Sequence, residues 1–371
     1  MNKINRRVTT SIFSCATIAG MAGMAIFQPV AYAGPVLKID DTKWISVGAG
    51  LRTSFFSVEN AAPNGSDRSK DFSVENIRLY LNGQVHKNIK LTFNTERDAA
   101  NNESARVLDA IARFEFSDSF NIWAGRFLPP SDRSNLNGPF YLNTWSFPLV
   151  QNYPALFAGR DNGIAAWGFA GSQFKYQFGV FEGRKGGANV SDSLLYSGRL
   201  TYNFWDAEPG YYNSSAYYGA RDILALGVAA MHQKDGAGTS VSKGDFTGWN
   251  VDALMEKKLA NNGVVSLEGA YYDYDLGNVA DVALVQGNGY FVLAGYLFPQ
   301  KVGIGQLQPH VRYQSLDPQG SSNTRTRTEA GVNYIIDGHD ARISLIFAED
   351  DPGTPGSKSA NSVLLGMQIQ L

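Results

Sequence analysis

Apolar and polar residues alternate along most of the chain from Trp44 onward. Within Trp44–Phe56 the odd positions are mostly apolar, whereas the even positions carry mainly Ser, Gly and Arg. The same period recurs in Ile77–Val85 and in Ile89–Thr95. A period of two places successive side chains on opposite faces of a β-strand, so each segment has one apolar and one polar face. No comparably strong helical period occurs, and the chain is predicted to be all-β.

Sixteen segments follow this pattern and are predicted to be strands. They are Trp44–Phe56, Ile77–Val85, Ile89–Thr95, Val107–Phe116, Phe120–Phe127, Asp161–Ala170, Phe174–Glu182, Leu194–Phe204, Ile223–Gln233, Phe246–Lys257, Val264–Asp273, Gly289–Phe298, Gln306–Gln314, Arg325–Ile336, Ala341–Glu349 and Ser362–Leu371. The connection 205–222 could hide two more, which would make eighteen. Sixteen is preferred because Gly210–Tyr218 lacks clear alternation. Both counts are even, as is the rule for bacterial single-chain barrels.

The connections between these segments alternate between long and short. Ser57–Asp71 and Gly183–Ser193 are long and polar, whereas His86–Asn88 and Ser117–Ser119 are short. The 18-residue connection 205–222 breaks this order. Transmembrane barrels have long external loops and short periplasmic turns, and a soluble sandwich has no reason to sort its connections in this way. The sequence therefore predicts a transmembrane antiparallel β-barrel in the outer membrane of a Gram-negative cell, with its apolar face toward lipid.

The polar face of each strand is predicted to line the lumen. A sixteen-stranded barrel leaves a channel, and a polar lumen holds water, so we expect passive passage of small hydrophilic solutes. The basic residues on this face and beside the third long loop are candidates for pore lining and anion binding. They are Arg52, Arg78, Lys90, Arg113, Arg126, Arg133, Arg160, Arg199, Arg312 and Arg342. Alternation is ambiguous near Arg126, where a slip of one residue would turn the side chain out of the lumen.

The stretch Gly125–Arg160 contains the longest segment without strand alternation. It includes Pro129 and Pro130, which cannot donate to a sheet ladder. It also carries the aromatic residues Phe140, Tyr141, Trp145, Phe147, Tyr153 and Phe157. Such an aromatic composition argues against disorder. We expect this third external loop to fold into the lumen and narrow it, with Arg126, Arg133 and Arg160 near the narrowest point.

The first 33 residues are predicted to be a secretory signal peptide, which leaves 34–371 as the mature barrel domain. Basic residues precede the apolar run Ile12–Phe27, and Ala31–Ala33 forms an A-x-A cleavage site. Cleavage would remove the only cysteine, Cys15, and three of the 32 basic residues. The remaining 29 basic residues against 34 acidic ones give a formal net charge of −5, which offers no footprint for nucleic acid.

No enzymatic, cofactor or metal site is predicted. Of the four histidines, His86 and His339 fall in turns, His232 faces outward, and His310 faces inward beside Arg312. Neither G-x-S-x-G nor H-E-x-x-H occurs. The alternative to a diffusion channel is a non-conducting barrel with a structural or adhesive role.

The segment Asn76–Arg97, NIRLYLNGQVHKNIKLTFNTER, resembles the phosphate-selective porin O and P family. GRFLPP at Gly125–Pro130 and GRDNG at Gly159–Gly163 are similar to the flanks of that family's constriction loop. The resemblance implies a homotrimer in outer-membrane lipid, an inward-folded third loop and an arginine ladder that conducts anions such as phosphate. Phosphate-selective members add lysines near the mouth. The segments 128–159 and 205–222 contain none, so a general or weakly anion-preferring porin is the other reading.

Overall fold

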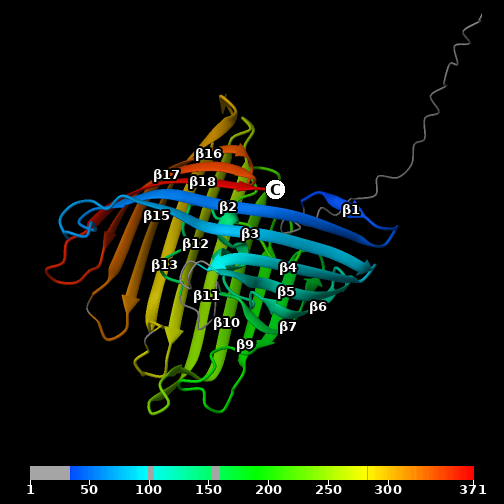
Figure 1. Cartoon of the computed structure of the whole chain (residues 1–371), viewed down its shortest axis with the longest axis horizontal. Coiled ribbons are helices and arrows are strands. Elements are labelled where there is room, and N and C mark those ends of the chain that lie inside the picture. Colours follow the sequence, from blue (N-terminus) through cyan, green and yellow to red (C-terminus); the bar gives the residue numbers. More distant parts are fainter. Residues whose placement is uncertain (1–33, 99–103, 152–158, 282, 322) are drawn as a thin grey trace, which may run out of the picture.

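The computed structural model describes residues 34–98, 104–151, 159–281, 283–321 and 323–371. The predicted signal peptide, residues 1–33, lies outside them. Sixteen long antiparallel strands form a closed barrel (Figure 1), because the last strand pairs with the first along Ser362–Gln370 and Gly50–Val58. Every other barrel strand pairs with its sequence neighbours on both sides. None of the helices in the described residues is long and apolar enough to cross a membrane.

All sixteen predicted strands are present. They are β2 (Trp44–Val58), β3 (Asp71–His86), β4 (Ile89–Asp98), β5 (Ser104–Ser117), β6 (Phe120–Phe127), β7 (Asp161–Ala170), β8 (Phe174–Phe181), β9 (Leu195–Asn203), β10 (Ile223–Gly238), β11 (Lys243–Lys258), β12 (Val264–Asp275), β13 (Gly287–Leu297), β15 (Gly305–Pro318), β16 (Arg325–Asp337), β17 (Ala341–Asp351) and β18 (Ala360–Gln370). Two short pieces, β1 (Val36–Lys38) and β14 (Lys301–Val302), form hairpins with β2 and β15. The connection 205–222 contains no strand, so the eighteen-strand alternative is wrong.

Several strands extend further toward the long-loop rim than the alternation predicts. Strand β3 begins at Asp71, six residues before the predicted Ile77, and β10 continues to Gly238 beyond the predicted Gln233. A register shift between Gln233 and Ala237 interrupts the pairing of β10 with β11. In the extension of β3 the alternation continues, with Phe72 and Val74 exposed, but a register shift opposite Arg52 and Thr53 changes its phase. In the extension of β10 the alternation has ended, while the pairing with β11 continues to Gly238.

The two faces of the wall differ as the alternation predicts. On β3, Leu79 is 58% exposed on the outer face, whereas its neighbour Arg78 is only 4% exposed on the inner face. Large exposed apolar side chains occur on the outer face of strands all around the barrel, including Val47, Val228 and Phe347. An apolar surface this extensive is unusual for a soluble monomer and suits contact with hydrocarbon.

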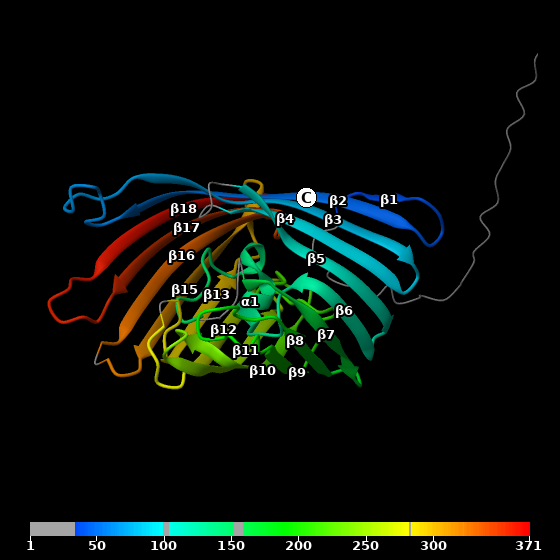
Figure 2. The same cartoon turned by 60° about the horizontal axis from the view of Figure 1, so that its bottom comes forward.

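The lumen contains the third long connection between β6 and β7. Its first part forms the short helix α1 (Arg133–Asn137) and the 3-10 turn η1 (Pro139–Tyr141), which lie inside the ring of strands (Figure 2). Asp132 caps α1 by accepting from the backbone N–H of Asn135, and Gly138 ends it with φ of 70°. Residues 152–158 of this connection, which include Tyr153 and Phe157, lie outside the described residues.

Candidate functional site

Arginines of the barrel wall hold the backbone of the third loop, residues 128–160. Arg52, Arg199, Arg312 and Arg342 face inward and donate to the loop carbonyls of Trp145 (2.5 Å), Ser131 (3.0 Å), Ser146 (2.9 Å) and Leu142 (2.7 Å), respectively. A loop buried inside a barrel has carbonyl groups that no sheet ladder satisfies, and each needs a donor. These four predicted pore residues therefore act as supports for the loop.

Neutral wall side chains and aromatic contacts add to this support. Gln368 donates to the carbonyl of Phe140 at 3.0 Å, and Asn333 donates to that of Asn143 at 2.8 Å. The guanidinium carbon of Arg52 lies 3.9 Å from the ring centroid of Trp145, a cation–π distance. The loop is thus held along most of its described length by strands from opposite sides of the barrel.

The connection 204–222 also enters the lumen, from the short-turn rim. Its Tyr211 is 1% exposed and donates from its hydroxyl to the carbonyl of Leu128 at 2.9 Å. From the wall, Gln177 donates to the carbonyl of Tyr211 at 2.9 Å. Tyr211 stacks on Trp123 with ring centroids 4.7 Å apart. We call residues 204–222 the connector; it packs against the third loop and is not a simple periplasmic turn.

An ion pair joins the loop to the connector. The guanidinium of Arg133 donates to both carboxylate oxygens of Glu208, at 2.6 and 2.5 Å, and both side chains are almost fully buried. Tyr217 donates from its hydroxyl to the same carboxylate at 2.6 Å. Burial alone would raise the pKa of Glu208, but the adjacent Arg133 lowers it, so the carboxylate stays ionised.

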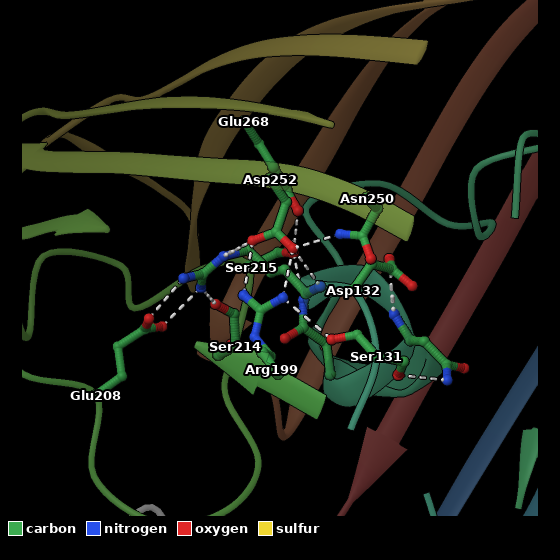
Figure 3. A network of polar contacts seen from close by, with 12 residues as sticks. Ser131, Asp132, Arg199, Glu208, Ser214, Ser215, Asn250, Asp252 and Glu268 are labelled. Atoms are coloured by element: carbon green, nitrogen blue, oxygen red, sulfur yellow. Dashed lines mark hydrogen bonds and ion pairs between the residues drawn. The ribbon is translucent and has the colours of Figure 1, made fainter. Parts of the chain in front are cut away.

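A second pair, on the wall, lies beside the first (Figure 3). Arg199 of β9 donates to both oxygens of Asp252 on β11, at 2.5 and 2.7 Å. Asp252 also accepts from the backbone N–H of Arg133 at 3.1 Å. Burial and the nearby Asp252 raise the pKa of the loop residue Asp132 to about 6. The network therefore combines two buried cations with closely spaced carboxylates.

A cavity of about 190 Å³ remains between the wall and the two inserted segments. The wall strands β3–β5 contribute Arg78, Tyr80, Asn94 and Asp109. The loop contributes Leu128, Leu136, Asn137, Gly138, Tyr141 and Arg160, and the connector contributes Tyr212, Asn213, Ser214, Ala216 and Tyr217. His339 completes the lining from the turn after β16. This cavity is the candidate constriction.

Two of the predicted basic residues belong to the cavity lining. Arg78 pairs through Nε with Glu96 at 2.5 Å, and Arg160 pairs through Nε with Asp109 at 3.2 Å. Asn94 donates to the other oxygen of Asp109 at 2.8 Å. The cavity lining thus has two guanidinium groups and one carboxylate, because Glu96 is not among the lining residues.

The structure places the remaining predicted basic residues elsewhere. Lys90 and Arg113 share the carboxylate of Glu115, at 2.7 and 2.6 Å. The assignment of Arg126 to the lumen is corrected. Arg126 pairs in register with Ala110 and Asn162 and alternates with the inward-facing residues of β6, so it lies on the outer face of the barrel. The physical reason is the two-residue period of the strand, which was ambiguous in sequence across Gly125.

Two histidines contact the inserted segments. His310 of β15 is buried, and its Nε2 lies 3.2 Å from the hydroxyl of Thr144. His339 approaches the connector, with its Nε2 2.8 Å from the carbonyl of Ala216. Burial lowers the pKa of His339 to about 4. Within the described ranges, no group of three or more acidic, histidine or cysteine side chains could hold a metal ion.

Sequence reasoning missed the insertion of the connector. Its length and its four tyrosines, Tyr211, Tyr212, Tyr217 and Tyr218, were visible as an exception among short turns. A further signal of the insertion was Glu208, the one glutamate between β9 and β10. In the structure this carboxylate is buried and pairs with Arg133. Tyrosine enrichment is also typical of the membrane interface, so composition alone does not distinguish the two locations.

Comparisons with known proteins agree with this architecture. The family model for phosphate-selective porin O and P matches residues 45–368. The structure is similar to the outer-membrane protein OmpT of Vibrio cholerae, at 14% identity and a TM-score of 0.58, over 91% of this chain and 100% of that one. It is also similar to an anion-selective porin from Comamonas acidovorans, at 14% identity and a TM-score of 0.59, over 89% of this chain and 100% of that one.

A third similar structure is the outer-membrane channel DcaP of Acinetobacter baumannii, at 12% identity and a TM-score of 0.57, over 92% of this chain and 100% of that one. A search of curated proteins found no match. The match to the family model covers nearly the whole barrel, from β2 to β18. The chain belongs to the phosphate-selective porin O and P family and is an outer-membrane porin.

Proposed function

We propose that this porin lets small hydrophilic anions, inorganic phosphate among them, diffuse passively through the cavity between β3–β5 and the two inserted segments. The observation that carries the proposal is that the guanidinium groups of Arg78 and Arg160 both line the cavity, whereas of their carboxylate partners, Glu96 and Asp109, only Asp109 does. Charged groups in a constriction select permeant ions by sign. The planar guanidinium fork also matches the oxygens of phosphate and carboxylate.

The proposal separates the arginines into two groups. Arg52, Arg199, Arg312 and Arg342 act on the loop backbone, and their contribution to permeation is indirect. Arg78 and Arg160 face the cavity directly. Support for the sign of selectivity comes from the Comamonas porin, which is described as anion-selective. Residues 128–159 and 205–222 contain no lysine, so we expect the preference for phosphate over chloride to be modest at most.

The test is conductance of the purified protein in planar bilayers. In a potassium chloride gradient, we expect open-channel steps and a reversal potential of the sign given by chloride permeation. Replacing chloride by phosphate on one side then measures the preference between the two anions. Absence of steps after verified insertion would favour the non-conducting, structural or adhesive alternative, and a potassium-selective reversal potential would overturn the anion proposal.

We also propose that the mature chain, 34–371, assembles as a homotrimer in outer-membrane lipid. Support comes from the structural similarity to OmpT of Vibrio cholerae, one structure of which is described as a trimer form. The mass of the detergent-solubilised protein, measured by light scattering, tests the assembly. The mass of one denatured chain tests removal of residues 1–33.

A further inference from the structure

Tyrosine and tryptophan mark both lipid interfaces on one half of the outer wall. On β9 the outward-facing row runs from Tyr196 to Tyr202, and on β13 it runs from Tyr290 to Tyr296. Each row thus has a tyrosine toward either rim, with smaller apolar residues between them. Further exposed members of this kind on neighbouring strands are Trp249, Tyr271 and Tyr313. Such residues form girdles where a barrel wall meets the lipid headgroups, so this half of the wall suits contact with lipid.

The other half of the wall lacks these girdles. Strands β17, β18 and β2–β7 lie side by side (Figure 1), and none of their described outward-facing residues is Tyr or Trp. Tyr80, Trp123 and Trp167 of these strands are buried on the inner face. Trp44 belongs to the same row of β2 as the buried Ser46. A wall that met lipid headgroups over this whole arc would be expected to carry girdle residues, as the opposite half does.

The middle of the girdle-free half presents uncharged, mostly aliphatic side chains. Its exposed members on β18, β2 and β3 are Val47, Leu51, Phe72, Val74, Ile77, Leu79, Val85, Leu365, Met367 and Ile369. We call these residues the apolar patch. An uncharged surface can pack against a second copy of itself without burying an unpaired charge, and the interfaces of homo-oligomers are typically apolar in this way.

The apolar patch is also taller than the hydrocarbon layer requires. On β3 its row runs from Val85 to Phe72, nearly the whole of the 16-residue strand. A tilted strand needs only about 9–11 residues to cross the hydrocarbon. Phe72, at the long-loop end of the row, is 87% exposed, and its ring centroid lies 5.1 Å from that of Phe55. A row longer than the lipid layer leaves apolar side chains in water unless protein covers them.

We infer that the apolar patch is the surface through which each chain packs against neighbouring copies of itself around a threefold axis. This inference rests on the homotrimer proposed above and names the surface that the homotrimer uses. In a closed ring of three, every chain contacts two neighbours, one on either flank of the patch. The opposite half of the wall, with its girdles, then faces lipid, and Phe72 is covered by protein.

The experiment is cross-linking of single-cysteine variants in isolated outer membranes with a membrane-permeant bis-maleimide. Leu79→Cys and Leu365→Cys place a thiol within the patch, and Phe72→Cys places one at its long-loop end. The matched controls are Val228→Cys on β10, the strand opposite β2, and Val241→Cys in the loop after β10, both at exposed positions. The only native cysteine is Cys15, in the predicted signal peptide, so the unaltered protein measures the background.

We expect a product of twice the mass of one chain from each patch variant and none from the controls or the unaltered protein. Absence of this product from all three patch variants, or equal yields from patch and control variants, would overturn the inference. A cross-linked product of another mass would reveal a different protein partner and would overturn it too. If Phe72→Cys fails to assemble, Leu79→Cys and Leu365→Cys still decide.

Light scattering on the detergent-solubilised protein separates this inference from the homotrimer proposal. A mass of three chains together with cross-links only from Val228→Cys would refute the assigned surface and leave the homotrimer standing. A mass of one chain would refute the homotrimer and the surface together.

Discussion

Arg133 and Glu208 join two segments that enter the lumen from opposite rims of the barrel. Arg133 begins the helix of the third loop, and Glu208 belongs to the connector between β9 and β10. Their bidentate contact is almost fully buried, and neither segment is part of the strand ladder. The constriction is therefore a two-part structure whose parts support each other, and the space left beside it determines what can pass.

Breaking this pair should loosen the constriction. Arg133→Met leaves Glu208 buried without its cationic partner, an effect that typically costs about 3–5 kcal/mol. We expect larger and noisier single-channel currents in planar bilayers, with the barrel still folded.

The double variant Arg133→Met/Glu208→Leu should restore quieter currents, because two apolar side chains often replace a buried ion pair with little loss. Lys185→Gln, which removes an exposed pair with Glu182, is the control and should leave the currents unchanged. Currents of normal size and noise in Arg133→Met would show that the pair does not hold the constriction.

The wall arginines should behave differently from the cavity arginines. Arg342→Met removes the donor to the carbonyl of Leu142 and leaves that buried group unsatisfied, at a cost of about 1–3 kcal/mol. We expect faster proteolysis within the third loop and a raised conductance, while the sign of ion selectivity is retained. Reversal of the selectivity in Arg342→Met would place this arginine in the permeation path itself.

The pH dependence follows from two groups in the inserted segments. The pKa of Asp132 is raised to about 6, so its ionised form is disfavoured in the folded loop, and lowering the pH through 6 relieves that cost. The pKa of His339 is lowered from 6.5 to about 4, so the stability from its neutral form is lost progressively as the pH falls from 6.5 to 4. The two effects oppose each other over this range, so each should be visible in the variant that lacks the other group.

Asp132→Asn, which cannot ionise, should show channel noise that increases as the pH falls from 6.5 to 4, because only the His339 effect remains. His339→Gln should show noise that decreases over the same range, because only the Asp132 effect remains. Noise that does not change with pH in either variant would refute the assigned roles of both groups.

The strand number could be predicted from sequence because lipid outside and water inside impose a period of two on each strand. Alternation at Trp44–Phe56 and Ile223–Gln233 is unambiguous for this reason. The start of β3 at Asp71 could not be predicted, because a register shift between Val74 and Asn76 changes the phase of the alternation there. The face of Arg126 was ambiguous because Gly125 beside it has no side chain and adopts φ of 127°.

The sequence could not predict which inward-facing arginines line the cavity and which hold the third loop. Alternation assigns a side chain to the inner or outer face, but it does not give its height in the barrel or its partner. Arg78 and Arg342 are both inward-facing strand residues, yet one lines the cavity and the other holds Leu142. Their roles depend on where the third loop lies, and that position is set by contacts distant in sequence, such as that between Arg133 and Glu208.

The central claim is that anions pass along the cavity lined by Arg78 and Arg160. The most direct measurement is the reversal potential of single channels in a potassium chloride gradient, for the unaltered protein and for Arg78→Gln/Arg160→Gln. We predict that the unaltered protein prefers chloride over potassium. In Arg78→Gln/Arg160→Gln the ratio of chloride to potassium permeability should fall about threefold for each charge removed, since a unit charge about 6 Å away in water contributes about 0.7 kcal/mol.

Arg325→Gln removes a positive charge from an exposed pair with Asp350 and should leave the reversal potential unchanged. Potassium preference in the unaltered protein, or an unchanged chloride preference in Arg78→Gln/Arg160→Gln, would contradict the account.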